Sequence, residues 1–472
     1  MNIKATKYIL YYLVVITLLL NVSCTQHDNW TTSGQLSFSE DTVSFDTVFT
    51  TIGSTTKYLI VKNTSPNNLI INKVYLAGGE QSYFRLNING IAAKEAKNVE
   101  IPANDSIFIF VEVTVDPTNQ NSPMVIADSI IFSMDNYSPN VKLIAYGQDV
   151  HLFNTYQLSN DTTFVNDKPY LIYNYLYVDS GVTLNIQPGC KIYFHHSSSL
   201  YVKGKLVAVG TKDEPIWFLG DRLEDFYKDI PGQWDRIAFF QSSKNNVMTY
   251  CNIKNSIIGV QVGETPNYND YADVALNNVK IFNTNYAAIF SMGGHITAKN
   301  TILANSGYYE VALLIGGTYK FYHCTINNYW AYGHRSTPSV ILSNNLIANG
   351  TMYVGDITNT EFGNCIIYGD MEDEIGFSVE NGGTIDAKLN NCLIRSAQYS
   401  TEDTTYFNNM CIFNQIPNFA STEDYDYHLL STSPAINKGD YNYAVLVPED
   451  YDGNNRTIDS NPDLGAYEYQ SN

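Results

Sequence analysis

The sequence predicts an all-β protein in which a β-sandwich is followed by a parallel β-helix. Three observations lead to this fold class. Tyrosine accounts for 37 of 472 residues, and with the frequent asparagines it suits strands and turns better than helices. The first third of the chain sets short apolar runs between turn residues. A short phrase then recurs through the second half, which indicates a repeat architecture.

The N-terminal residues 1–23 have the form of an export signal. Two lysines precede an apolar run over residues 8–20, which has signal-peptide length and is short for a membrane span. The tripeptide Val-Ser-Cys ending at Cys24 resembles the cleavage box of bacterial lipoproteins. That resemblance implies a lipidated Cys24, a polar tether over residues 24–33 and a place in the bacterial cell envelope, on the outer membrane and facing the periplasm or the surface. An ordinary secretory signal and an N-terminal anchor helix are the alternatives.

Residues 34–150 are predicted to form the β-sandwich. About seven short strands with turn signals between them fit this length, and this is the pattern of a sandwich. The stretches "FDTVFTTIGSTTKYLIVKNTSPNNLIINKVYLAGG" and "IPANDSIFIFVEVTVDP" resemble the Hydin-type immunoglobulin-like domain. The resemblance implies a spacer or adhesion module without catalytic residues of its own.

The recurring phrase of the second half aligns in seven copies. Its central position is occupied by Cys251, Val279, Thr301, Cys324, Asn345, Cys365 and Cys392. Two positions later each copy has Ile or Leu, on the same face of a strand, and Asn is common one position before and four positions after the centre. Because asparagine tolerates left-handed backbone angles, both Asn columns suit corners and are expected to form ladders there. A repeat of 20 to 28 residues with short strands predicts a parallel β-helix over residues 151–412.

Four of the seven cysteines fall in the central column, which is expected to point inward. Free cysteine behaves as a small buried apolar residue, and no metal-binding spacing accompanies these cysteines. We therefore expect no metal site. A disulfide between Cys365 and Cys392, on stacked coils, is the alternative that the spacing leaves open. Cys190 and Cys411 fall outside the aligned copies.

Further phrases resemble right-handed parallel β-helix lipoproteins. The resemblance lies in residues 176–220, in "PGQWDRIAFF", and in the closing phrases "DYHLLSTSPAINKGD" and "DYDGNNRTIDSNPDLGAYEY", so that residues 413–472 are expected to close the helix. It implies the fold, its right-handed sense and export. It implies no single activity, because this fold carries lyases, hydrolases, adhesins and scaffolds.

A ligand site is predicted on an aromatic loop, "YWAYGHRSTP", and on tyrosines one coil earlier. The rings are expected to stack on a sugar and the arginine to hold its carboxylate. The candidate residues are Tyr308, Tyr309, Tyr329, Trp330, Tyr332, His334 and Arg335. The alternative is an ordinary surface loop of an aromatic-rich protein.

Two acidic stretches are candidates for sites of chemistry. "GDMEDEIG" over residues 369–376 is predicted to be a solvated loop, with a cation site or an acid and base for catalysis as the alternative. In "DYDGN" the side chains of Asp450, Asp452 and Asn454 alternate as in a calcium loop, but the glycine and the twelfth residue do not match one. We expect a closing turn there and no cofactor, with calcium as the alternative.

The position after the central column is expected to face outward. Its residues change from polar, at Asn252 and Lys280, to an apolar ridge that requires a cover. The ridge consists of Ile302, Leu346, Ile366 and Leu393, interrupted by Thr325. We expect residues 397–419, or the aromatic loop within them, to cover it, with a partner protein as the alternative. No pair of acids appears in this column.

The formal charge of −20 excludes general nucleic-acid binding, because phosphate contacts need clustered lysine and arginine. The acidic excess is concentrated after residue 400. We predict a lipid-anchored envelope protein that binds a glycan or an envelope protein without cleaving it, and that meets the membrane through its lipid alone. A polysaccharide lyase or glycoside hydrolase, and a structural or assembly component of the envelope, are the alternatives.

Overall fold

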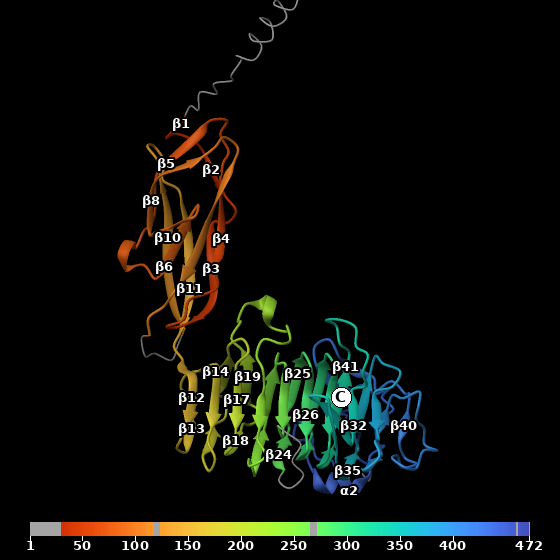
Figure 1. Ribbon diagram of the computed structural model, residues 1–472. Coiled ribbons are helices and arrows are strands. Elements are labelled where there is room, and N and C mark those ends of the chain that lie inside the picture. Colours follow the sequence, from red (N-terminus) through yellow and green to blue (C-terminus); the bar gives the residue numbers. More distant parts are fainter. Residues whose placement is uncertain (1–29, 118–122, 265–270, 459–460, 472) are drawn as a thin grey trace, which may run out of the picture. The chain divides into compact units, whose positions relative to one another are not determined.

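The computed structural model describes residues 30–117, 123–264, 271–458 and 461–471. Within these ranges the regular structure is almost entirely β-strand, as the sequence predicts (Figure 1). The chain divides into two units, Met1–Gln148 and Asp149–Asn472. The expected signal at residues 1–23 and the expected lipid site Cys24 lie outside the described residues. No helix in the described ranges combines the length and the apolarity needed to cross a membrane.

The first unit consists of two sheets around one hydrophobic core. One sheet contains β1 (Trp30–Thr31), β5 (Asn68–Leu76), β10 (Met124–Ser133), β11 (Asn140–Gln148), β3 (Thr42–Phe49) and β8 (Glu95–Ile101). The other contains β2 (Leu36–Phe38), β4 (Lys57–Asn63), β9 (Ser106–Val113), β6 (Phe84–Ile88) and β7 (Ile91–Ala92). Every second side chain of β9 is buried, which is the two-residue period of a strand with one face on a core. Trp30 and Thr31, expected in the tether, instead pair with β5.

The second unit is a coil of parallel strands in three rows, which is the arrangement of a β-helix-like solenoid. The sheet of rows A and B begins with β12 (His151–Leu158) and β14 (Tyr170–Val178), and β14 pairs with the first strands of both rows. From there each turn of the coil passes through rows A, B and C in that order. Row A contains β16 (Lys191–Phe194), β19 (Ile216–Gly220), β22 (Cys251–Lys254), β25 (Lys280–Thr284), β28 (Ile302–Ser306), β31 (Thr325–Asn328), β36 (Ile366–Gly369), β39 (Leu393–Ile394) and β40 (Ile412–Phe413). Row B contains β17 (Ser199–Val202), β20 (Ile237–Phe239), β23 (Ile258–Val262), β26 (Ala287–Met292), β29 (Tyr309–Leu314), β32 (Val340–Ser343) and β37 (Ile375–Ser378). Row C contains β13 (Thr162–Phe164), β15 (Thr183–Ile186), β18 (Lys205–Val209), β21 (Asn246–Thr249), β24 (Ala272–Asn277), β27 (Gly294–Lys299), β30 (Thr318–Tyr322), β35 (Ile357–Gly363) and β38 (Ile385–Asn390).

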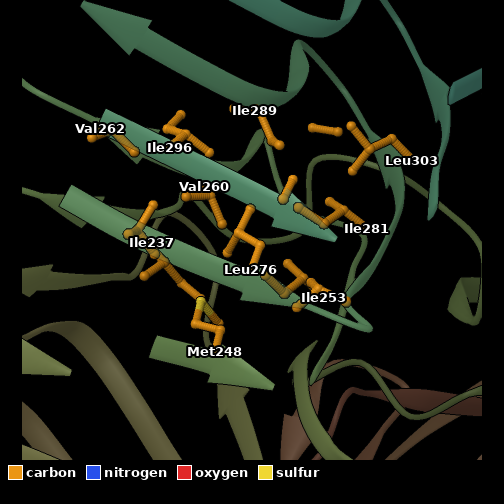
Figure 2. Packing of buried hydrophobic residues seen from close by; sticks show 14 of the residues in the cluster. Ile237, Met248, Ile253, Val260, Val262, Leu276, Ile281, Ile289, Ile296 and Leu303 are labelled. Atoms are coloured by element: carbon orange, nitrogen blue, oxygen red, sulfur yellow. The ribbon is translucent and has the colours of Figure 1, made fainter. Parts of the chain in front are cut away.

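The core of the solenoid is a continuous apolar column inside the three rows. Figure 2 shows how side chains from the three rows meet inside the coil. Ile253 and Ile281 come from row A, Val260 from row B, and Met248 and Leu276 from row C. All of these side chains are almost fully buried. Each one stabilises the fold by roughly 1.5–3 kcal/mol, and each also packs on its equivalents in the coils above and below.

Strand pairing confirms six of the seven predicted copies of the repeat. It places Cys251 in one column with Val279, Thr301, Cys324, Cys365 and Cys392. The copy at Asn345 is wrong, because β33 (Asn345–Ala348) and β34 (Thr351–Val354) form an antiparallel hairpin outside the coil. Asn349 and Gly350, both with positive φ, close this hairpin as a two-residue turn.

The column contains all six cysteines of the described chain. The exclusion of Cys190 and Cys411 was wrong, since pairing brings both into line with Cys251 and Cys392. All six are buried free thiols, so the Cys365–Cys392 disulfide is not formed in this structure. Each Sγ lies 3.3–3.6 Å from a backbone carbonyl of row C in the preceding coil, and Thr301 Oγ1 makes the same contact at 3.3 Å. Where the column has Cys or Thr, the side chain donates one hydrogen bond to the preceding coil, and Val279 fills the same position without one.

The asparagines before this column do occupy corners with positive φ. Such angles are found at Asn278, Asn300, Asn364 and Asn391. They do not form the expected ladder, because their side-chain amides donate to the closing segment, residues 419–469. This segment includes β41 (Phe419–Ser421), β42 (Asp426–Leu429) and α2 (Tyr441–Leu446).

The closing segment also covers the apolar ridge. Ile302 packs with Tyr427, Tyr451 and Tyr467 in one buried cluster, and a second cluster joins Ile366 and Leu393 to Leu429, Ala435 and Leu464. The expected internal cover is present, but of the segment 397–419 named for it Phe419 packs on both ridge clusters, and the rest of the cover comes from residues after it. Tyr399 and Phe407, in the segment expected to cover the ridge, pack instead against the main core at the end of the coil. Leu346 is not part of the ridge, since it lies on the hairpin β33–β34.

Candidate functional site

The residues predicted to bind a ligand do not converge on one site. Tyr308 and Tyr309 cluster with Tyr286 of the previous coil, at ring-centroid distances from Tyr286 of 5.1 and 6.1 Å. Tyr308 is exposed and Tyr309 is half-buried. The Trp330 ring lies against Gly307, where a Cβ would come within 3.1 Å of Cζ2. These rings thus pack on one another and on the coil.

The rest of the aromatic loop reaches toward a different part of the solenoid. Trp330 and Tyr332 meet edge to face at 5.4 Å, and the Tyr332 hydroxyl donates to the carbonyl of Asp229 at 2.9 Å. Tyr329 and His334 are exposed on the same loop. Tyr332 is therefore in contact with the segment that carries Asp229, which forms one wall of the groove described below.

Arg335 is unable to hold a ligand carboxylate, contrary to the prediction. Its side chain is buried and forms a two-pronged ion pair with Glu374, at 2.6 and 2.7 Å, and a further ion pair with Asp370. Burial opposes its charge, but the hydrogen bonds to Glu374 outweigh this and raise the pKa of Arg335. The acidic loop is also not simply solvated, because Glu374 is completely buried and Asp373 accepts hydrogen bonds from Ser396 and its neighbours.

Two adjacent hollows open on the outward face of row A. The first, of about 380 Å³, lies over β16, β19 and β22, and the second, of about 430 Å³, lies over β19, β22 and β25. They share Trp217 and Lys254 in their lining. We refer to the two hollows together as the groove.

The floor of the groove is the predicted outward column, extended toward its N-terminal end. Strand pairing puts Lys191, Trp217, Asn252 and Lys280 in line, followed by Ile302 of the covered ridge. The groove is thus the stretch of row A where the closing segment no longer lies over the sheet. The polar residues in this stretch are the ones that the sequence analysis noted before the ridge.

One wall of the groove is the loop over residues 221–233, which includes η2 (Asp225–Tyr227). Two contacts fix it on the coil. Asp229 forms an ion pair with Lys254 at 2.5 Å, and Asn255 Nδ2 donates to the carbonyl of Lys228 at 3.0 Å. Within the loop, Gln233 Nε2 donates to the carbonyl of Ile230 at 2.8 Å. This wall is therefore held in place by the same strand that carries Lys254.

The opposite end of the groove is formed by the closing segment. Asp424, Tyr425, Tyr451 and Asp452 line the second hollow. Tyr425 stacks on Phe282 at 4.8 Å, and Asp452 forms an ion pair with Lys212 at 3.2 Å. The groove is therefore built from elements more than 200 residues apart in the chain.

The charge of the groove is opposite to that of the protein as a whole. The lining of the first hollow contains Lys191, Arg222, Lys228 and Lys254 and no acidic residue. The second contains Lys212, Lys254 and Lys280 with two aspartates. Burial lowers the pKa of Lys280, against the opposing effect of Asp452 and Asp426, and its ammonium lies 4.3 Å from the Tyr451 ring centroid.

One polar atom of the floor has no partner within the described residues. The Oδ1 atom of Asn252 is buried without a hydrogen bond, and the residue lines the second hollow. A buried acceptor in this state is costly unless a ligand or water supplies a donor. Asn252 thus marks a position for a hydroxyl or an amide N–H.

Both carboxylates in the lining of the second hollow have partners within the chain. The aspartate at position 452 is already engaged by Lys212 and by His428 Nε2 at 2.9 Å. The second aspartate of the lining, Asp424, accepts a hydrogen bond from Ser421. Asp452 is thus held between the solenoid and the closing segment, and Asp424 within the closing segment.

The structure places no calcium loop at residues 450–454. Asp450 is buried and accepts from the backbone N–H groups of Asp452, Asn454 and Glu468 at 2.7–2.8 Å, whereas the Asp452 side chain points to Lys212. The two carboxylates therefore diverge. Among the described residues, no group of three or more His, Cys, Asp or Glu side chains is arranged to hold a metal ion.

Sequence reasoning missed the groove because its cations are far apart in the chain. Lys191, Lys228 and Lys280 come together only through the register of the coils and the return of the loop. The available signal was the polar start of the outward column. Extending the repeat backward by two coils would have added Trp217 and Lys191 to Asn252 and Lys280.

Comparisons with known proteins do not show a family for this chain. No protein-family model and no curated protein matches the chain. A family 123 glycoside hydrolase from Clostridium perfringens matches 24% of this chain and 25% of its own, with 10% identity and a TM-score of 0.18. A protein of unknown function from Porphyromonas gingivalis W83 matches 27% of this chain and 61% of its own, with 11% identity and a TM-score of 0.17. The chain thus spans less than two thirds of either protein, and likenesses at these TM-scores carry no argument about function.

Proposed function

We propose that this protein is an exported, lipid-anchored β-helix protein of the bacterial cell envelope that binds a glycan in the groove without cleaving it. One observation carries the proposal. Trp217 stands on the floor between the two hollows, half-buried, with Lys254 beside it in the lining of both. An aromatic face flanked by hydrogen-bond donors is what a sugar ring needs for stacking and orientation.

The remaining parts of the proposal rest on the sequence. The Val-Ser-Cys24 box supports lipidation, and the strand phrasing of the first unit supports an immunoglobulin-like spacer. The opening and closing phrases of the second unit support a right-handed helix. In this proposal a lipid on Cys24 anchors the protein to the membrane, the first unit serves as a spacer, and the solenoid binds the ligand.

The experiment is a glycan-array screen of the full-length protein in detergent, followed by affinity measurement on the glycans that bind. Trp217→Ala is expected to raise the dissociation constant at least about tenfold, since a central aromatic contact is lost. Trp330→Ala, in the aromatic loop, is the matched control and should leave it unchanged. Binding that depends on Trp330 and not on Trp217 would move the site to that loop.

Cleavage is the second candidate function, and the same experiment decides it. The bound glycan is incubated with the protein and its products are separated by size. An unchanged chain length supports a binding protein. Shortened products that disappear in Trp217→Ala would make the protein a lyase or hydrolase that works in the groove.

A further inference from the structure

We infer that the ligand of the groove is an acidic oligosaccharide in which anionic sugars alternate with neutral ones. Its carboxylate or sulfate would lie between Lys191 and Lys228 in the first hollow, its ring on Trp217, and a neutral sugar in the second hollow. This inference rests on the proposed function and specifies its ligand.

The first step is the isolation of positive charge. The protein has a formal charge of −20, yet the lining of the first hollow contains four cationic side chains and no acid. Basic residues gathered in a concave site of an acidic protein create a local attraction that the rest of the surface does not have. A neutral ligand would accept hydrogen bonds from these side chains but would gain none of this attraction.

The second step separates cations that are occupied from those that are free. Arg222 is held by Glu224 through two nitrogens, at 2.9 and 3.1 Å, and Lys254 by Asp229. Lys191 and Lys228 form no ion pair within the described part of the chain, and both are exposed. Lys191 rises from the floor and Lys228 belongs to the wall, so an anion entering the first hollow meets an ammonium group from each side.

The third step concerns the second hollow, which has a different character. Asp424 and Asp452 stand in its lining beside Lys212 and Lys280, so its charges are balanced and a further anionic sugar gains less there than in the first hollow. The unpaired Oδ1 of Asn252 instead accepts a hydrogen bond from a hydroxyl or an N-acetyl N–H. Adjacent hollows that differ in charge in this way match a chain in which acidic and neutral residues alternate.

The experiment measures calorimetric binding of three oligosaccharides of equal length to the full-length protein in detergent. The probes are an alternating glucuronate–N-acetylhexosamine oligomer, the same oligomer with its carboxyls reduced to alcohols, and a uniformly charged oligogalacturonate. We expect the alternating acidic oligomer to bind at least about tenfold more tightly than either of the others, with an affinity that falls as salt rises.

Variants assign this preference to the two lysines. Lys191→Gln with Lys228→Gln should remove the difference between the acidic and the reduced oligomer, whereas Lys203→Gln, an exposed lysine elsewhere on the solenoid, should leave it intact. Trp217→Ala should weaken both oligomers alike.

The outcomes are distinguishable. Equal binding of the acidic and reduced oligomers overturns the inference but leaves glycan binding in place. Tighter binding of oligogalacturonate overturns the alternating pattern. If none of the three probes and no glycan of the array binds, the proposed function itself fails.

Discussion

Asn364 and Asp440 exchange two hydrogen bonds: the Asn364 amide Nδ2 donates to the Asp440 carbonyl at 3.0 Å, and Asn364 Oδ1 accepts from the Asp440 N–H at 2.8 Å. The same corner in other coils binds successive carbonyls of the closing segment, with Asn391 on Lys438, Asn300 on Glu449 and Asn278 on Tyr451. The closing segment therefore runs back along the solenoid, opposite to the order of the coils. The asparagines that turn the chain at these corners therefore also bind the closing segment to the solenoid.

Asn364→Gly should destabilise the protein by about 1–3 kcal/mol, because it leaves the Asp440 N–H without a partner. Glycine retains the left-handed backbone at this corner, where φ is 54°. The loss of unfolding free energy therefore measures the contribution of the side-chain amide. Urea unfolding measures the change. The control is Asn245→Gly, an exposed corner with φ of 55°, which should shift stability by less than about 0.5 kcal/mol. Equal effects of the two variants would mean that the hydrogen bonds of the corner asparagines do not hold the closing segment.

The ridge under the closing segment gives a second prediction. Ile366→Asp should destabilise the protein by more than about 3 kcal/mol, because it buries a carboxylate among Leu429, Ala435 and Leu464. Ile347→Asp on the hairpin β33–β34 is the control, since its side chain is 64% exposed. Thermal melting compares them. A wild-type melting temperature for Ile366→Asp would place the ridge outside the core.

The strand repeat could be predicted from the sequence, but the hairpin that interrupts it could not. The inward alternation and the corner asparagines are local features, so they are enough to align copies such as those at Cys324 and Cys365. The hairpin was misread because Asn345-Leu-Ile-Ala has the polarity of a coil strand, although the Asn349-Gly350 turn was a hairpin signal.

The site depends even more on contacts between residues that are distant in the chain. The ligand site was predicted on the aromatic loop because its residues are adjacent in the sequence, yet Arg335 is held by Glu374, 39 residues later. The groove depends on which strands stack and on where the closing segment ends. Neither can be obtained without the register of the whole coil, so Lys191 and Lys228 gave no sign of belonging together.

The cysteine column predicts uniformly slow thiols. Burial raises the pKa of Cys190 to about 11, and it raises that of Cys251 further. At these two positions the reactive thiolate is therefore almost absent at pH 8, and burial keeps a reagent away from all six thiols. In a Cys24→Ser background, a thiol reagent should label none of the six within minutes in buffer and all six in urea. Rapid labelling of Cys324 in buffer would contradict the inward register.

The last prediction concerns Glu310, which is completely buried near the start of β29. Burial raises the pKa of Glu310 to about 8, against the opposing hydrogen bonds from the N–H and hydroxyl of Ser306 and the charge of Arg335. In the unfolded chain the same carboxyl titrates near 4.5. Between these two pKa values the unfolded state has released its proton while the folded state retains it, so stability falls as pH rises through this window.

Glu310→Gln removes this titration and keeps an oxygen that accepts from Ser306. The variant should therefore gain stability relative to wild type from pH 5 to pH 8, by at most about 1.4 kcal/mol per pH unit, with no gain below the unfolded pKa. Urea unfolding at several pH values measures the difference, and Glu372→Gln, an exposed acid of the nearby loop, provides a flat control. If the difference between Glu310→Gln and wild type stays constant over this range, Glu310 is ionised in the folded protein and Arg335 compensates its charge.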